Sequence, residues 1–89
     1  MELSEIRKQI DAIDDQLVKL LCQRMALSAQ VADYKKEHNL PIFVPAREEE
    51  ILKKVETMTE PDLACHIRQL YTKLFEISRN YQSSRNEVI

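Results

Sequence analysis

The chain has 89 residues, enough for one small domain, and its 13 basic and 15 acidic residues give a formal net charge of −2. This balance, without a basic stripe, argues against nucleic-acid binding, and no apolar run reaches the ~18 residues of a membrane span. Glycine is absent, which excludes glycine-rich phosphate loops and disfavours tight hairpins. Because the polar N-terminus lacks a signal-peptide core, we expect a cytoplasmic protein.

An apolar heptad repeat dominates the first part of the chain. Apolar side chains recur at alternating steps of four and three from Ile6 to Tyr34, interrupted only at Arg24. Such a seam is typical of a long helix that packs against other helices. With Ser4 as the expected N-cap, the pattern predicts a helix over residues 5–37.

The length of this helix has a consequence for assembly. A helix of about 33 residues is roughly 50 Å long, whereas a compact domain of this size has a diameter of roughly 30 Å. The apolar seam continues along the whole helix, so part of it has no cover within its own chain. A second copy is the simplest cover, and we therefore expect a homodimer.

A connection punctuated by prolines follows the first helix. It is expected over residues 38–45, where Ile42, Phe43 and Val44 should pack inward. Pro45 suits the first turn of a second helix, because the missing N–H of proline is not needed there.

Two further helices complete the predicted fold, which is all-α with three helices in one domain. The second is predicted over residues 46–58, and its early glutamates complement the helix dipole. The third is predicted over residues 61–84, with Pro61 in its first turn. Residues 85–89 are expected to form a frayed tail.

Arg24 and Lys35 interrupt the expected pattern of the first helix. Arg24 occupies a seam position, where it either sets the register of a helix pair, extends out to solvent or faces a ligand cavity. Lys35 follows eleven residues later, about three turns on, so it projects from nearly the same face about 16 Å away. If both face a cavity, its wall consists of Leu27, Ser28 and Val31; otherwise Lys35 is a solvated lysine.

Arg7 stands apart from this pair. It precedes Arg24 by about 25 Å along the helix and cannot reach the same cavity from its own chain. It reaches the cavity of a second copy if two long helices run antiparallel. The alternative is an ordinary surface arginine.

Four polar residues on the other two helices are ambiguous when taken singly. Ser78 and Gln82 share one face of the third helix, where they either extend the site or mark an apolar stripe that fades into solvent. Arg47 and Glu48 lie in the first turn of the second helix and are also typical of a surface turn. The isolated cysteines and histidines lack the paired spacing of zinc sites, so no metal is expected.

Taken together, these residues make the chain similar to the AroQ-class (type II) chorismate mutases over about residues 4–84. The matching segments are IRKQIDAIDDQLVKLLCQRMALSAQVADYKK, PAREEEIL and IRQLYTKLFEISRNYQ. Their combination is specific, although each is weak alone. The resemblance implies an intertwined homodimer with two equivalent active sites shared between the chains.

The resemblance also implies a reaction, the Claisen rearrangement of chorismate to prephenate in phenylalanine and tyrosine biosynthesis. This isomerisation requires no metal and no cofactor. In the implied site, Arg24 and Arg7 of the other subunit hold the two carboxylates of the substrate. Lys35 and Gln82 flank the ether oxygen.

The remaining implied contacts lie at the ends of the substrate. Arg47 and Glu48 hold the end with the ring hydroxyl, and Ser78 lies near a carboxylate. Some family members have an aspartate three residues before the Arg-Glu pair, where this chain has Val44. The resemblance then leaves the hydroxyl to Glu48 alone, which bears on substrate affinity more than on the reaction.

Two other functions fit the same features. An isochorismate pyruvate lyase would share the fold and the basic cavity. A non-enzymatic helical dimer that binds a pathway metabolite would share the apolar seam. The resemblance fits either a free-standing enzyme or the N-terminal part of a fusion with another enzyme of the pathway.

Overall fold

The computed structural model describes residues 1–86 and is all-helical over that range. Its helices are α1 (Leu3–Glu37), α2 (Pro45–Thr57) and α3 (Pro61–Asn86). The predicted helices are confirmed, and each observed boundary lies within two residues of its prediction. Because α3 continues to Asn86, it includes the start of the expected tail; residues 87–89 lie outside the described part of the chain.

The beginning of α1 differs from the prediction in its cap. Glu2, not Ser4, is the N-cap residue, and no side chain caps this helix end. The Glu2 carbonyl accepts hydrogen bonds from the N–H groups of Glu5 and Ile6 at 3.0 and 3.1 Å. The predicted Ser4 cap is therefore wrong, because the backbone continues the helix past that serine.

The end of α1 is a Schellman motif built without glycine. Asn39 adopts a left-handed conformation with φ 55°, which asparagine tolerates better than most residues. The N–H groups of Asn39 and Leu40 donate to the carbonyls of Lys36 and Lys35 at 3.4 and 2.8 Å. This turn ends the helix at Glu37, two residues after Lys35, and sends the chain back toward α2.

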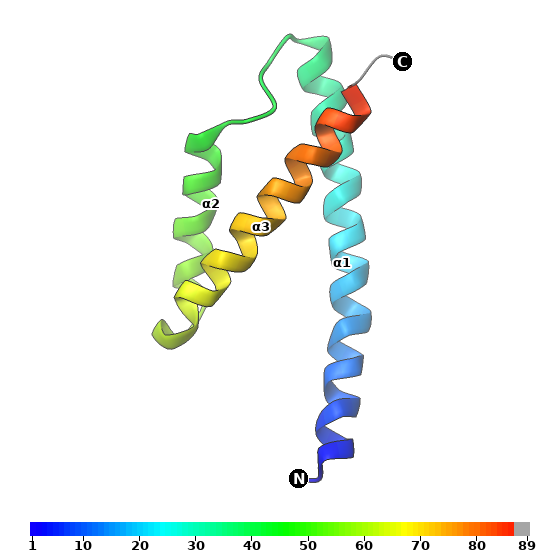
Figure 1. The fold of residues 1–89 in the computed structure, drawn as a ribbon, viewed down its shortest axis with the longest axis vertical. Coiled ribbons are helices and arrows are strands. Elements are labelled where there is room, and N and C mark those ends of the chain that lie inside the picture. The colour runs from blue at the N-terminus through cyan, green and yellow to red at the C-terminus, as the bar shows by residue number, and fades with distance from the viewer. Residues whose placement is uncertain (87–89) are drawn as a thin grey trace.

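Helix α3 holds the other two helices together. It packs against α1 on one side and α2 on the other, while α1 and α2 make no backbone contact of their own. Figure 1 shows α3 crossing obliquely between them, with its C-terminal end beside that of α1. The buried apolar core is correspondingly small and consists of Ala29, Ala32, Leu52, Val55 and Phe75.

Ion pairs reinforce both contacts of α3. Arg68 donates to Glu56 at 2.7 Å and to Glu49 at 3.3 Å, which ties α3 to α2. These acceptors, Glu56 first, raise the pKa of Arg68 above its ordinary value, so the arginine stays cationic. Arg85 pairs with Asp33 at 3.2 Å and joins the C-terminal ends of α3 and α1.

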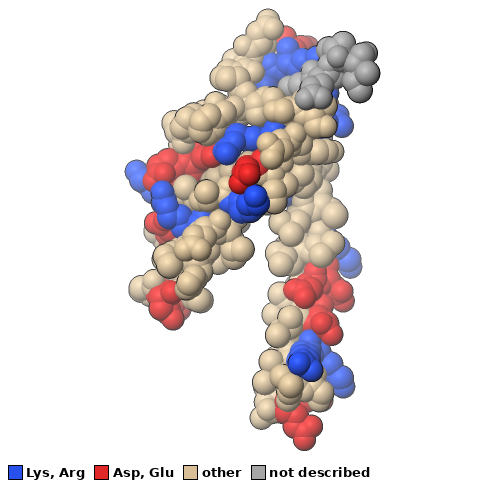
Figure 2. Space-filling model, viewed as in Figure 1, with Lys and Arg blue, Asp and Glu red and all other residues tan. Residues whose placement is uncertain are grey.

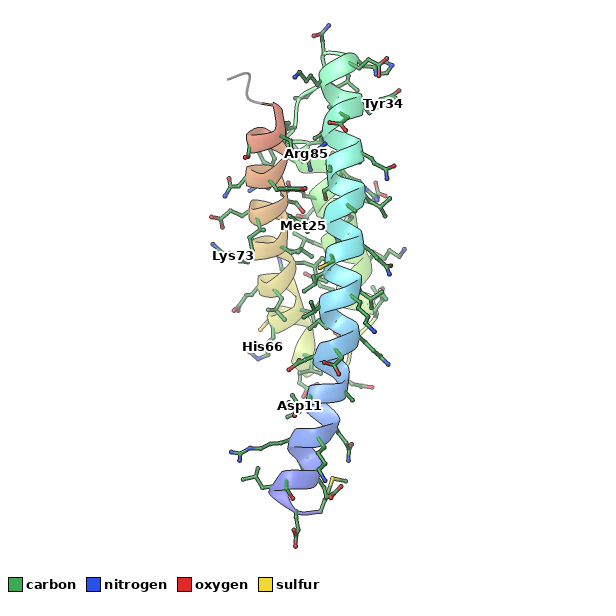
Figure 3. The ribbon with its side chains drawn as sticks, turned by 90° about the vertical axis from the view of Figure 1, so that its right-hand side faces the viewer. Asp11, Met25, Tyr34, His66, Lys73 and Arg85 are labelled. Atoms are coloured by element: carbon green, nitrogen blue, oxygen red, sulfur yellow. The ribbon has the colours of Figure 1, made fainter. Side chains whose placement is uncertain are left out.

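Much of the α1 seam has no cover within the chain. Figure 2 shows an open space between the N-terminal half of α1 and the α2–α3 hairpin, and the side of α1 that faces it is mostly uncharged. In Figure 3 the labelled Asp11 lies on the part of α1 that extends beyond α3. The exposed seam residues of this half are Ile6, Ile10, Ile13, Leu17 and Leu20.

The overall dimensions of the chain reflect this exposed N-terminal half of α1. The radius of gyration is 16.3 Å and the longest extent is 53 Å, compared with a radius of about 12 Å for a compact domain of this length. None of the three helices combines the length and hydropathy needed to cross a bilayer.

The connection between α1 and α2 is only partly buried. Ile42 is half-buried, but Phe43 and Val44 are exposed. The prediction that all three pack inward is therefore wrong for Phe43 and Val44 in the single chain. The segment spans between α1 and α2, which do not contact each other, so these two side chains have no core to enter.

Candidate active site

A cavity of about 320 Å³ lies where the C-terminal half of α1, the start of α2 and the C-terminal half of α3 meet. Its size lies at the lower end of the range of small-molecule sites, roughly 300–1,000 Å³. The cavity exists because α3 separates α1 from α2. The side chains that line it are Arg24, Leu27, Ser28, Val31, Lys35, Ile42, Val44, Arg47, Glu48, Ile51, Phe75, Ser78, Arg79 and Gln82.

Arg24 is held in place by α3. Its Nη1 donates to Ser78 Oγ at 3.2 Å, and its guanidinium lies 5.8 Å from the centre of the Phe75 ring. Ser78 Oγ also lies 3.4 Å from Ser28 Oγ on α1. The seam arginine is thus half-buried and oriented by hydroxyl and aromatic contacts, and none of these contacts neutralises its charge.

Lys35 lies in the same cavity as Arg24, as their helical spacing predicts. Leu27, Ser28 and Val31 line the cavity between them, also as predicted. The Lys35 ammonium group donates to the carbonyl of Ile42 at 2.8 Å. A backbone carbonyl carries no formal charge, so this lysine too brings an uncompensated positive charge to the cavity.

Gln82 presents a buried amide without a complete set of partners. The residue is 8% exposed, and its Oε1 atom has no hydrogen-bond partner among the described residues. Leaving a buried polar atom unpaired costs about 1–3 kcal/mol. Because Gln82 lines the cavity, a bound ligand is the natural partner for its amide, which can present either oxygen or nitrogen by a half-turn.

The α2 side of the cavity carries one carboxylate. Glu48 pairs with Arg79 of α3, and both side chains are largely shielded, at 22% and 31% exposure. Arg47 lines the cavity but also pairs with Glu50 at 2.7 Å in an exposed position. The first turn of α2 therefore contributes a carboxylate held by an ion pair and an exposed arginine.

The electrostatic balance of the cavity favours an anion. Within residues 1–86 its charged lining consists of four cations, Arg24, Lys35, Arg47 and Arg79, and one anion, Glu48. Half-buried guanidinium and ammonium groups bind carboxylates through short charge-assisted hydrogen bonds. A small molecule with two negative charges and a few hydrogen-bonding groups fits this lining.

Comparison with known proteins assigns the family. The family model described as "Chorismate mutase type II" matches residues 6–83, which include every residue that lines the cavity. The chain belongs to this family. No solved structure gives a significant match to it.

Three curated relatives illustrate the range of proteins that contain such a domain. The chain is 46% identical over 61% of its length to a "Bifunctional chorismate mutase/prephenate dehydratase" of Aquifex aeolicus, of which the match covers 15%. It is 42% identical over 70% of its length to a "T-protein" of Enterobacter agglomerans, of which 18% is covered. It is 41% identical over 61% of its length to a "Chorismate mutase" of Methanocaldococcus jannaschii, of which 54% is covered. The chain thus spans only part of the curated relatives it matches.

The structure brings together six of the seven residues that the chorismate mutase resemblance implied. The exception is Arg7, which is exposed on the free half of α1 and does not line the cavity. The cavity residues among the seven are Arg24, Lys35, Arg47, Glu48, Ser78 and Gln82. Val44, where some chorismate mutases have an aspartate, also lines the cavity and leaves Glu48 as its acid.

Sequence reasoning missed Arg79. It follows Ser78 on a helix that carries several other charged residues, so it resembles a solvated arginine. In the structure it contacts Glu48 and lies 4.7 Å from the centre of the Phe43 ring. A weak signal was available, because Arg79 is three residues before Gln82 and therefore shares part of its helical face.

Proposed function

We propose that the chain catalyses the conversion of chorismate to prephenate. The observation that carries this proposal is the juxtaposition of Arg24, Lys35 and the unpaired Gln82 amide in one cavity of a chorismate mutase type II domain. Chorismate carries two carboxylates, an ether oxygen and a ring hydroxyl, which match the cationic, amide and carboxylate groups of the lining.

The reaction needs shape selection and charge stabilisation. In the rearrangement the ether C–O bond breaks while a C–C bond forms within the same molecule, so no atom is gained or lost. Holding the two reacting ends together in a compact conformer can supply a large part of the rate acceleration. The remaining contribution comes from stabilising the negative charge that develops on the ether oxygen.

Each cavity residue has a defined part in this proposal. Arg24, held by Ser78, binds one carboxylate of the substrate. Lys35 leaves the Ile42 carbonyl and donates to the ether oxygen, and Gln82 donates a second hydrogen bond from its amide nitrogen. Since an amide does not titrate near neutral pH, the Gln82 contact requires no particular protonation state.

A homodimer would complete the site. We propose that the free half of α1 packs antiparallel against that of a second copy, which covers the exposed seam. If Arg7 of one copy lies level with Ser28 of the other, the twofold axis passes midway between them, near Leu17 and Val18. Both of these side chains are exposed and apolar in the single chain, as an interface centre requires.

A second hollow beside the first gives side chains of the proposed partner helix a place to enter. It measures about 360 Å³ and shares Arg24 and Arg47 with the first cavity. Its apolar lining includes Val55, Met58 and Tyr71. If the Arg7 side chain of the partner entered it, Arg7 would lie beside Arg24, where the second carboxylate of the substrate needs a cation.

The test is an assay of the purified chain with chorismate and, in parallel, with isochorismate. We expect loss of chorismate and stoichiometric formation of prephenate, identified by chromatography and NMR. Release of pyruvate from isochorismate without prephenate formation would establish the lyase instead. Tight binding of chorismate without turnover of either compound would favour a metabolite-binding module.

A further inference from the structure

Glu48 is a cavity carboxylate that forms an ion pair with Arg79 of the same chain. Arg79 reaches across from α3 and donates through Nη1 to Glu48 Oε2. This contact uses Oε2 and leaves Oε1 to accept from a ligand. A single ligand hydrogen bond at Oε1 is therefore compatible with the ion pair.

Arg79 is itself held in place by its surroundings. Its guanidinium lies over the Phe43 ring at 4.7 Å, a distance at which cations are attracted to aromatic faces. The side chain is 31% exposed, less than the 64% of Arg47 in the same cavity. Phe43 thus has a function that its exposed position would not suggest, since it fixes the arginine that fixes Glu48.

The pair also determines the charge at this end of the cavity. The carboxylate of Glu48 is the one anion of the lining within the described residues, and Arg79 neutralises it. Arg47 adds a positive charge nearby, although Glu50 balances it in part. No net negative charge therefore remains here to attract a cation.

This balance matters for two substrates that differ at one group. A ring hydroxyl is neutral and donates one hydrogen bond, whereas an aliphatic amine in its place is protonated near neutral pH. An ammonium group would be strongly attracted to an unpaired carboxylate, but it is attracted only weakly to one that an arginine already neutralises. Members of this family differ in this respect, since one relative, 35% identical over 52% of the chain, is a "4-amino-4-deoxychorismate mutase" of Streptomyces venezuelae.

We propose that Arg79 is a positioning residue that orients Glu48 and, by neutralising it, makes this site select a ring hydroxyl over an ammonium group. The proposal rests on the chorismate mutase function proposed above. It gives Arg79 no contact with the reacting atoms. Its effect reaches the substrate through the Glu48 carboxylate.

The experiment compares kcat/KM for chorismate with that for the analogue that has an amino group in place of the ring hydroxyl. For Arg79→Met we expect the preference for the hydroxyl to fall roughly tenfold, the size of one added charge-assisted contact. For Glu48→Gln we expect the opposite, a stronger preference for the hydroxyl, because Arg79 is then unpaired. Arg79→Lys, which keeps the charge, should retain most of the wild-type preference.

Two controls separate this effect from a structural one. Arg85→Met removes another α3 arginine and its ion pair with Asp33 outside the cavity, and it should not alter the preference. In a Glu48→Gln background, Arg79→Met should return the preference toward the wild-type value, because it removes the positive charge that Glu48→Gln leaves unpaired; a purely structural effect would not be reversed in this way. Circular dichroism checks that each variant keeps its helices.

The outcomes distinguish this inference from the function on which it rests. An enzyme that converts chorismate but whose substrate preference is the same in wild type, Arg79→Met and Glu48→Gln would overturn the role of Arg79 alone. If Arg79→Met instead lowers kcat/KM equally for both substrates, in the wild type and in the Glu48→Gln background alike, the positioning role is also overturned. Such a result would indicate that Arg79 contacts the substrate directly. A folded wild-type protein without chorismate turnover would overturn the proposed function, and this inference with it.

Discussion

Gln82 is the residue at which stability and function conflict most clearly. A buried amide oxygen without a partner destabilises the folded chain by about 1–3 kcal/mol, and Gln82 Oε1 is such an atom. Buried unsatisfied groups of this kind are rare in native proteins and are often functional. The arrangement is understandable if a ligand supplies the missing hydrogen bond.

A Gln82→Leu substitution tests this conflict. Leucine has a similar volume and no polar atoms, so we expect the free energy of unfolding to stay equal or rise by about 1 kcal/mol. Turnover of chorismate should fall by about 100-fold or more, because a transition-state hydrogen bond is lost. Denaturant unfolding at a fixed protein concentration and kcat/KM are the measurements.

The matched control is Gln69→Leu, the same exchange at an exposed position of α3 outside the cavity. It should change neither quantity appreciably. A Gln82→Leu variant that is both less stable and fully active would contradict the assignment of the amide to the ligand.

The charged residues of α1 lead to a second prediction at this scale. Arg24→Ala and Lys35→Ala should each lose at least 100-fold in kcat/KM, because each removes a charge-assisted contact from the cavity. Helical content should persist, since the small core of the chain does not include either residue. Lys73→Ala, which removes an exposed lysine paired with Glu76, serves as the control; near-normal turnover in either α1 variant would refute the site assignment.

Much of the site could be predicted from the helical spacing of single residues. The sequence placed Arg24 and Lys35 on one face because a regular helix fixes their relative direction. It could not relate α2 to α3, since no local rule specifies how two helices dock. The Glu48–Arg79 pair depends on that docking, which is why Arg79 was missed while its neighbour Ser78 was not.

At the scale of elements, α1 consists of two halves with different surroundings. Its C-terminal half packs against α3 through Ser28, Ala29 and Ala32, all buried. Its N-terminal half has no cover in the chain (Figure 1), although its apolar repeat is equally regular. A helix this long with an uncovered apolar seam is expected to associate with another apolar surface.

Ile13→Lys tests whether the uncovered half of α1 is an interface. Ile13 is 61% exposed in the single chain, so a lysine there would cost little if the chain remained alone. In the proposed dimer it would place a charge in an apolar seam, which is costly unless the charge is paired. We expect the variant to dissociate at micromolar concentration, as measured by analytical ultracentrifugation, and to lose activity with dissociation.

Asp15→Lys is the matched control for this variant. It introduces the same side chain about 200° around the helix from Ile13, on the polar side of α1. The control should remain associated and active. If the two lysine variants and the wild type have the same association state, the seam is not part of an interface.

The helix boundaries were predictable because prolines and apolar periodicity act locally. Pro45 and Pro61 begin α2 and α3 as expected. The Ser4 cap failed because a favourable cap residue does not end a helix that can continue through it. The inward packing predicted for Phe43 failed because α1 and α2 do not contact each other and leave it no core to enter; its ring instead lies against the Arg79 guanidinium.

The whole molecule is a small three-helix unit from which the N-terminal half of α1 extends. Its radius of gyration of 16.3 Å exceeds the about 12 Å of a compact chain of this length, as the seam length led us to expect. Composition and periodicity could predict this elongation, because a 35-residue helix cannot fold back on itself. They could not place Arg7 relative to a cavity, because that relation belongs to two copies and not to one.

The position of Arg7 allows a decisive test of shared sites. In the proposed dimer each site takes Lys35 from one chain and Arg7 from the other. An Arg7→Ala chain paired with a Lys35→Ala chain therefore has one intact site and one site that lacks both residues. Each variant alone has only defective sites.

Mixing the two inactive variants should therefore restore activity. Random exchange of subunits gives about half heterodimers with one intact site in two, so we expect about a quarter of the wild-type activity. Heterodimer formation is verified by tagging one chain and measuring co-purification. A site formed within a single chain would instead leave both sites of every heterodimer defective, because each chain lacks one of the two residues. Confirmed heterodimers without recovered activity would therefore rule out the contribution of Arg7 across subunits.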